Sequence, residues 1–114
     1  MADLRKVEMY RAIIRQLLGQ YATYKPSHGE IEVHPIFDDE HNHYQVVGIG
    51  WDQQKRVYGC SIHLEIKNEK IWIQLNNTEW DIAQALVEEN ISKDDIVIGF
   101  HPPSLRQYSG YAVA

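Results

Sequence analysis

Residues 56–76 read RVYGCSIHLEIKNEKIWIQLN, and this stretch decides the fold. Apolar and polar side chains alternate on both sides of a short polar break, and such a period of two is typical of half-buried β-strands. The break, at 67–70, is too short for a crossover between parallel strands, so it predicts an antiparallel hairpin. We therefore expect two adjacent strands, at 56–66 and 71–76.

The pairing of these two strands predicts what each face of the sheet carries. If 67–70 is a loop of four residues, one face is the core beneath the helices, and it carries Tyr58, Cys60, Ile62, Leu64, Ile66, Ile71, Ile73 and Leu75. On the outer face, the same pairing places Ser61 opposite Asn76, His63 opposite Gln74 and Glu65 opposite Trp72. A shift by one residue would exchange the two faces, because successive side chains of a strand alternate.

Two more strands precede this hairpin, at 30–37 and 43–51, and the polar segments 38–42 and 52–55 follow them. Connections of this length favour antiparallel neighbours, which predicts a four-stranded meander. Pro35 has no N–H to donate, so the first strand is expected at an edge of the sheet.

The chain begins with a predicted helix. Asp3 is a suitable N-cap, because its carboxylate can accept hydrogen bonds from the first turn. Apolar residues then recur at three- and four-residue steps, which predicts an amphipathic helix of about five turns. These residues are Leu4, Val7, Tyr10, Ile14, Leu17, Leu18 and Tyr21. The helix is expected to end before Pro26, with Ser27 and Gly29 at its exit.

Helical periodicity returns after the fourth strand. Thr78 is the expected N-cap of a helix that runs to about Glu89. Its predicted sheet-facing residues are Ile82, Ala83, Leu86 and Val87. A turn at 93–95 and a short C-terminal strand at 96–100 follow. With both helices on one face of the meander, we expect a single two-layer α+β domain over residues 1–114.

The chain of 114 residues has a formal net charge of −5. A protein that holds DNA through its phosphates needs a basic face, so this charge disfavours direct nucleic-acid binding. The one local concentration of cations is on the first helix, where Arg5, Lys6, Arg11 and Arg15 lie.

The single cysteine, Cys60, excludes an intramolecular disulfide and suits a reducing compartment. No stretch approaches the run of about 20 apolar residues that spans a bilayer. We therefore expect a cytoplasmic protein that does not insert into a membrane.

Residue types used by enzymes are present but poorly arranged. His41 and His43 lie in a polar loop without the ligand spacing of a zinc site. Cys60 and His63 have opposite parity along one strand, which predicts side chains on opposite faces. Ser61 shares a face with His63 but lies too far along the strand for a dependable hydrogen bond. We predict a non-catalytic protein with no metal site and no cofactor site.

The outer face is the predicted binding surface. A four-residue loop at 52–55 brings Gly48 opposite Gly59 and places Tyr44 beside His63. Aromatic side chains on a polar face are typical of the centres of protein interfaces. The candidate partner-binding residues are Tyr44, His63, Trp72 and Gln74, with Arg106 as a cation at the rim. The alternative is a solvated sheet face with cross-strand aromatic pairs.

Several short stretches also carry a family resemblance through their order and spacing. They are Tyr24-Lys25-Pro26, residues 29–37, Gly50-Trp51-Asp52, Arg56-Val57-Tyr58-Gly59-Cys60, His63, Lys70-Ile71-Trp72-Ile73-Gln74, Asp94-Asp95-Ile96-Val97, Gly99-Phe100-His101 and Tyr111-Ala112-Val113-Ala114. With them, the chain resembles the XisI-like fdxN-element excision controlling factors of cyanobacteria nearly from end to end.

The resemblance implies a control factor for the programmed excision of a DNA element that interrupts a nitrogen-fixation gene. In that system a separate recombinase cuts and joins the DNA, so the resemblance transfers no catalytic residue. XisI-like proteins are commonly encoded beside an XisH-like protein related to nucleases, which implies a protein partner of that kind. Self-association into a homodimer is a further expectation. Direct DNA binding and inhibition of a partner nuclease are the alternatives.

Overall fold

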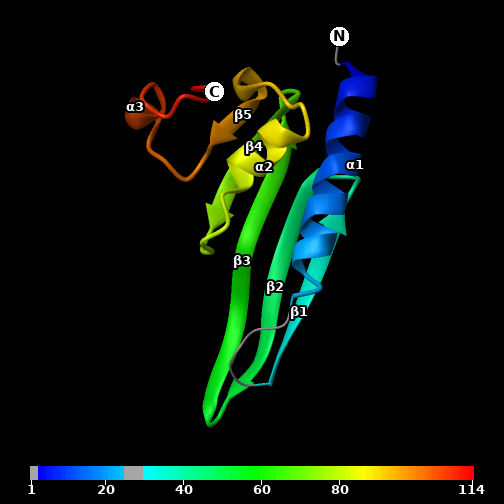
Figure 1. Ribbon diagram of the computed structural model, residues 1–114, viewed down its shortest axis with the longest axis vertical. Coiled ribbons are helices and arrows are strands. Elements are labelled where there is room, and N and C mark those ends of the chain that lie inside the picture. The colour runs from blue at the N-terminus through cyan, green and yellow to red at the C-terminus, as the bar shows by residue number, and fades with distance from the viewer. Residues whose placement is uncertain (1–2, 25–29) are drawn as a thin grey trace.

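The chain forms one helix, then four antiparallel strands, and then returns through a second helix to add a fifth strand (Figure 1). The structure is a computed structural model that describes residues 3–24 and 30–114. Its elements are α1 (Leu4–Tyr21), β1 (Glu30–Asp38), β2 (His43–Asp52), β3 (Lys55–Lys67), β4 (Lys70–Asn76), α2 (Ile82–Glu88), η1 (Lys93–Asp95), β5 (Ile96–Ile98) and α3 (Pro103–Arg106).

Helix α1 begins where the sequence predicts. The Asp3 carboxylate accepts hydrogen bonds from the backbone N–H groups of Arg5 and Lys6, at 3.1 and 3.2 Å. The buried part of its apolar stripe is Tyr10, Ile14 and Leu18. The predicted helix exit at Pro26, Ser27 and Gly29 lies outside the described residues.

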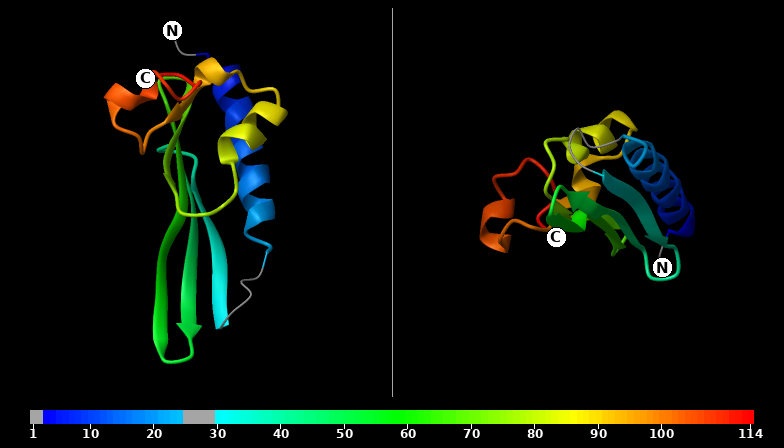
Figure 2. Two further views of the ribbon diagram at one scale, coloured as in Figure 1. Left: turned by 60° about the vertical axis from the view of Figure 1, so that its left-hand side comes forward. Right: turned by 90° about the horizontal axis from the view of Figure 1, so that it is seen from below.

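The strands form one sheet in the order β1-β2-β3-β4-β5, with β1 at an edge as Pro35 predicts. β1 to β4 are antiparallel neighbours, whereas β5 is parallel to β4 because α2 carries the chain back across the sheet. Helices α1 and α2 cover the same face (Figure 2), so the two-layer α+β architecture is confirmed. No helix in the described ranges has the length and apolarity needed to cross a membrane.

Helix α2 begins three positions later than predicted, at Ile82. Its N-cap is Asp81, whose carboxylate accepts a hydrogen bond from the N–H of Gln84 at 3.1 Å. The prediction of Thr78 as the cap is therefore wrong. Thr78 instead donates its hydroxyl hydrogen bond to the side-chain oxygen of Asn76, at 2.6 Å, and so belongs to the turn before the helix.

A β-bulge at Ser61 changes the predicted pairing of β2 with β3. At the distal end the register is as expected, with Gly48 opposite Gly59. Val47 then pairs with Cys60 but Val46 pairs with Ile62, which leaves Ser61 as an extra residue on β3.

Because of this bulge, Tyr44 of β2 and Tyr58 of β3 each lie on the face opposite to the predicted one. Tyr44 pairs with Leu64 rather than with His63, and it is fully buried in the core. Its predicted place on the outer face is therefore wrong. Tyr58, predicted in the core, is 73% exposed on the opposite face.

A second irregularity affects β4. Glu65 lies opposite Trp72 as predicted, but His63 pairs with Leu75, which leaves Gln74 as the extra residue. The predicted pairing of His63 with Gln74 is therefore wrong. Ser61 does not pair with Asn76 either, because Ile62 takes that position.

The sheet is longer than the helices that cover it. The molecule measures 50 × 30 × 24 Å. In Figure 1, the far halves of β1, β2 and β3 extend beyond α1. We call this part of the sheet the arm. The helices, β4, β5 and the C-terminal segment lie at the other end.

The first anchor of α1 is a polar contact with η1. Lys6 Nζ lies 2.7 Å from Asp95 Oδ2, and the Tyr10 hydroxyl donates to the same carboxylate. Burial and this carboxylate raise the pKa of Tyr10. Burial by itself would raise the pKa of Asp95, but the hydrogen bonds from Lys6 and Tyr10 outweigh it, so the net shift is downward.

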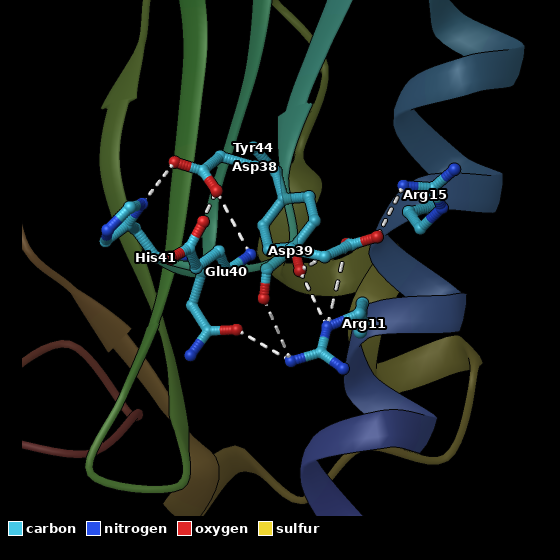
Figure 3. A network of polar contacts seen from close by, with 8 residues as sticks. Arg11, Arg15, Asp38, Asp39, Glu40, His41 and Tyr44 are labelled. Carbon is cyan, nitrogen blue, oxygen red and sulfur yellow. Dashed lines mark hydrogen bonds and ion pairs between the residues drawn. The ribbon is translucent and has the colours of Figure 1, made fainter.

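The second anchor joins α1 to the β1–β2 loop and the core (Figure 3). Arg11 Nε donates to the hydroxyl of Tyr44 at 3.0 Å, and its Nη2 donates to Asn42 Oδ1 at 2.9 Å. The Tyr44 hydroxyl donates to Asp39 Oδ1 at 2.9 Å, and Arg15 pairs with the other oxygen of Asp39 at 3.1 Å. Tyr44 is therefore a core side chain whose polar end links two elements.

We expect Asp95→Ala to lower the free energy of unfolding by about 1–3 kcal/mol, because it leaves the partly buried Lys6 and Tyr10 donors without their acceptor. Urea denaturation at pH 7 measures this loss. Asp94→Ala is the matched control, since Asp94 is an exposed carboxylate on the same 3₁₀ turn.

The difference between wild type and Asp95→Ala should also depend on pH. A carboxyl whose folded-state pKa is lowered stabilises the fold above its ordinary pKa of 3.8, and that contribution disappears as the pH falls through the folded-state pKa. The two proteins should therefore converge in stability below about pH 4. Equal losses for Asp94→Ala and Asp95→Ala would contradict this role of Asp95.

Candidate functional site

The candidate site lies on the outer face of the sheet, where Trp72 is held between two cations. Lys67 Nζ lies 4.9 Å from the centre of its ring and Arg106 Cζ lies 5.2 Å from it. The indole N–H donates to the carbonyl of Lys67 at 3.2 Å. Trp72 is on the predicted face but is only 8% exposed, so it supports the surface from below.

Arg106 fastens the C-terminal segment over Trp72. Its guanidinium donates to the backbone carbonyls of His101 at 3.1 Å, Gly99 at 3.3 Å and Val113 at 3.4 Å. One side chain therefore connects α3 with the chain before it and with the chain end. The sequence predicts a cation at a rim, and the structure places it as a partly buried cross-link.

Gln74 lies on the sheet directly beside Gly99 of this segment. Its side-chain amide donates to Glu65 Oε1 at 3.0 Å. A Cβ atom on Gly99 would lie 2.6 Å from Gln74 Oε1 and 3.2 Å from the carbonyl of Ile73. A side chain at position 99 would force the Gln74 amide and the carbonyl of Ile73 to shift, because the backbone passes so close to β4.

Next to Gln74, two histidines share a hydrogen bond. His43 Nδ1 lies 3.0 Å from His63 Nε2, and His43 Nε2 lies 3.7 Å from Glu65 Oε2. Burial and then the charge of His43 lower the pKa of His63, while Glu65 opposes them. Of the two rings, His43 is the one whose second nitrogen faces the Glu65 carboxylate.

The other histidine of the loop turns elsewhere. His41 Nδ1 lies 2.8 Å from Asp38 Oδ2, so His41 and His43 do not converge on one point. Among residues 3–24 and 30–114, no three or more His, Cys, Asp or Glu side chains are grouped as metal ligands would be.

The bulge brings Cys60 and His63 to the same face, so the prediction of opposite faces is wrong. Their hydrogen bonds nevertheless go to other groups. The Cys60 thiol donates to the carbonyl of Ile62 at 3.1 Å and lies 3.6 Å from the Gln45 amide nitrogen. The Ser61 hydroxyl is also engaged, because it donates to the carbonyl of Val46 at 3.2 Å.

The C-terminal segment adds exposed apolar side chains that the sequence analysis missed. Phe100 is 48% exposed, Leu105 is 52% exposed and Tyr108 is 79% exposed. We call these three residues the C-terminal rim. Their signal in the sequence is weak, because Phe100 falls at the end of the predicted strand 96–100, and Leu105 and Tyr108, after Pro102 and Pro103, follow no strand or helix period.

Four of the five predicted site residues therefore come together. His63, Trp72 and Gln74 lie on the outer face of β3 and β4, and Arg106 packs on Trp72. Tyr44 does not belong to this group, because it lies in the core on the other face.

The fold and site define a class: a small α+β protein whose sheet has helices on one face and a C-terminal segment over part of the other. The family model "XisI protein" matches residues 4–113, and the chain belongs to the XisI family. The XisI-like fold expected from the sequence is thereby confirmed.

Two solved structures from Anabaena variabilis are similar to this chain. One is a XisI-like protein, with 41% sequence identity and a TM-score of 0.87 over 96% of this chain and 99% of that chain. The other is the fdxN element excision controlling factor XisI, with 31% identity and a TM-score of 0.79 over the same shares of each chain. A search of curated proteins found no match. Family and neighbours support a role as a controlling factor.

The histidine pair yields a pH prediction. His43→Asn should raise the pKa of His63, because it removes one of the two causes that lower it. NMR titration of the His63 ring protons measures this shift, and His34→Asn on β1 is the control. An unchanged His63 pKa in His43→Asn would contradict the coupling.

The direction in which stability changes with pH follows from the lowered pKa of His63. Because the folded-state pKa of His63 is below its ordinary value of 6.5, the unfolded chain binds the proton more readily. Wild type should therefore lose stability as the pH falls from about 6.5 through the folded-state pKa, and His43→Asn should lose less.

Proposed function

We propose that this protein is a non-catalytic control factor for the excision of a DNA element, and that it acts by binding a protein partner through the C-terminal rim and the adjoining outer face. The observation that carries the proposal is a set of exposed apolar side chains on a segment that is already fixed in place. Exposed aromatic residues near buried anchors are typical of interface centres.

Pre-ordering supports this surface. The Arg106 contacts with three carbonyls and with Trp72 hold the segment in its conformation. A surface that is ordered before binding loses little conformational entropy in the complex, which favours affinity. His63 and Gln74 add polar groups beside it.

The charges near this segment suggest an acidic partner surface. Lys67 lies over Trp72, Lys93 lies over the ring of Tyr111 at 5.9 Å, and Lys70 donates to the carbonyl of Ala114. Three lysines therefore lie near this segment, in a chain whose formal charge is −5. Complementary charge orients partners and speeds their encounter.

The partner that the family resemblance implies is an XisH-like protein. Because such proteins are related to nucleases, binding could restrain their activity, and inhibition of a nuclease is the finer version of the same proposal. Direct DNA binding is the competing function. It is weakened because Arg11 and Arg15, the central cations of α1, already contact Asp39.

The test is co-expression with the XisH-like protein encoded nearest to it, followed by purification of the complex and measurement of Kd. The Phe100→Ala/Tyr108→Ala double variant should weaken binding at least about tenfold, because truncated interface aromatics are typical hot spots. Tyr24→Ala, an equally exposed tyrosine at the end of α1, should bind as wild type does.

Trp72→Ala is a poorer probe, because a buried side chain cannot be removed without disturbing the fold. Circular dichroism and thermal unfolding are the checks that the Phe100→Ala/Tyr108→Ala double variant is folded. Normal binding by the folded double variant would rule out the rim. Absence of any complex, with salt-sensitive retention on DNA, would favour direct DNA control instead.

A further inference from the structure

The arm has one open edge. β3 pairs with β2 from Lys55 onward, but its pairing with β4 begins only at Ile62. The carbonyl of Ser61 accepts a hydrogen bond from the N–H of Asn77 at 2.8 Å, which closes the ladder on that side. Beyond this point, the part of the chain that the structure describes supplies no backbone partner to residues 55–60. Figures 1 and 2 show this stretch at the border of the sheet.

The opposite edge of the sheet is protected. β1 carries Pro35, which has no N–H, and the charged or polar side chains of Glu30, Glu32 and His34. Proline and charge are the usual means by which proteins prevent an edge from pairing with another strand. On the open edge of β3 the cations Lys55 and Arg56 lie at one end, and residues 57–60, which read VYGC, have neither proline nor charge. An edge left open in this way is suited to pairing with another strand.

We propose that this edge pairs with the same edge of a second copy of the chain, antiparallel and about a two-fold axis at Tyr58. A two-fold axis between the two copies of Tyr58 makes the pairing self-complementary. It sets Val57 opposite the partner's Gly59 and Arg56 opposite the partner's Cys60. The arms then join into one continuous six-stranded sheet.

The side chains fit this register. Arg56 comes to lie opposite the partner's Cys60, which is neutral, so the cations of the two copies do not face each other. A Cβ on Gly59 would meet no atom within 4 Å, which leaves open space where the partner's Val57 would lie. Tyr58, 73% exposed on the outer face, would lie beside the partner's Tyr58 as a cross-strand aromatic pair.

The contact is short, since one strand edge is well below the area of an obligate interface. The dimer should therefore depend on protein concentration. It is also independent of the proposed function, because the C-terminal rim lies at the other end of the molecule and the oligomeric state is measured without a partner.

The test is analytical ultracentrifugation of the full chain over about a hundredfold range of concentration. Wild type should pass from monomer to dimer. Tyr58→Lys and Tyr58→Glu should each weaken the dimer at least about tenfold, because like charges would face each other across the axis. An equimolar mixture of the two variants should restore dimerisation, since opposite charges then meet.

Tyr24→Lys is the matched control, because Tyr24 is as exposed as Tyr58 but lies off the edge. It should dimerise as wild type does. A wild type that stays monomeric over the whole range would overturn the proposal. So would Tyr58→Lys that dimerises normally, or a mixture of the two variants that stays monomeric, because the axis would not pass at Tyr58.

Discussion

The structure depends on one extra residue, Ser61, in the longest strand of the sheet. Its hydroxyl donates to the carbonyl of Val46 on one side, and its carbonyl accepts from the N–H of Asn77 on the other. The bulge is therefore held from both sides, by β2 and by the residue that follows β4. Because side chains alternate along a strand, an added residue changes the face of everything on one side of it.

The second anchor of α1, at Tyr44, follows from this bulge. In the register without it, Tyr44 would lie on the outer face, and its hydroxyl would be on the wrong side of the sheet for Arg11 and Asp39. With the extra residue in place, Tyr44 lies in the core and its hydroxyl contacts Arg11 and Asp39. A buried tyrosine hydroxyl needs such partners. The same shift places His43 on the outer face beside His63, so the core and the candidate site are set together.

What could be predicted from the sequence was local. Asp3, the stripe of α1 and the pairing of Glu65 with Trp72 each follow from residues a few positions apart. Bulges at Ser61 and Gln74 depend instead on how whole strands compete for partners, so parity arguments failed once they crossed either one. The C-terminal rim was missed for a related reason: Arg106 holds it through carbonyls and a ring distant from one another in the chain, and no local period records that.

Ser61 also divides the molecule into two regions with different surfaces. On one side, β4, β5 and the C-terminal segment extend the sheet and carry the rim; on the other, β3 runs on in the arm without β4. Pairing of two arms at β3 would therefore leave both rims uncovered, at the far ends of one elongated dimer. Such a dimer would carry two equal binding surfaces. For a dimeric partner, binding at one surface would raise the effective concentration of its second subunit at the other surface. In that arrangement the bulge would separate the proposed pairing edge, on one side of it, from the proposed partner-binding rim on the other.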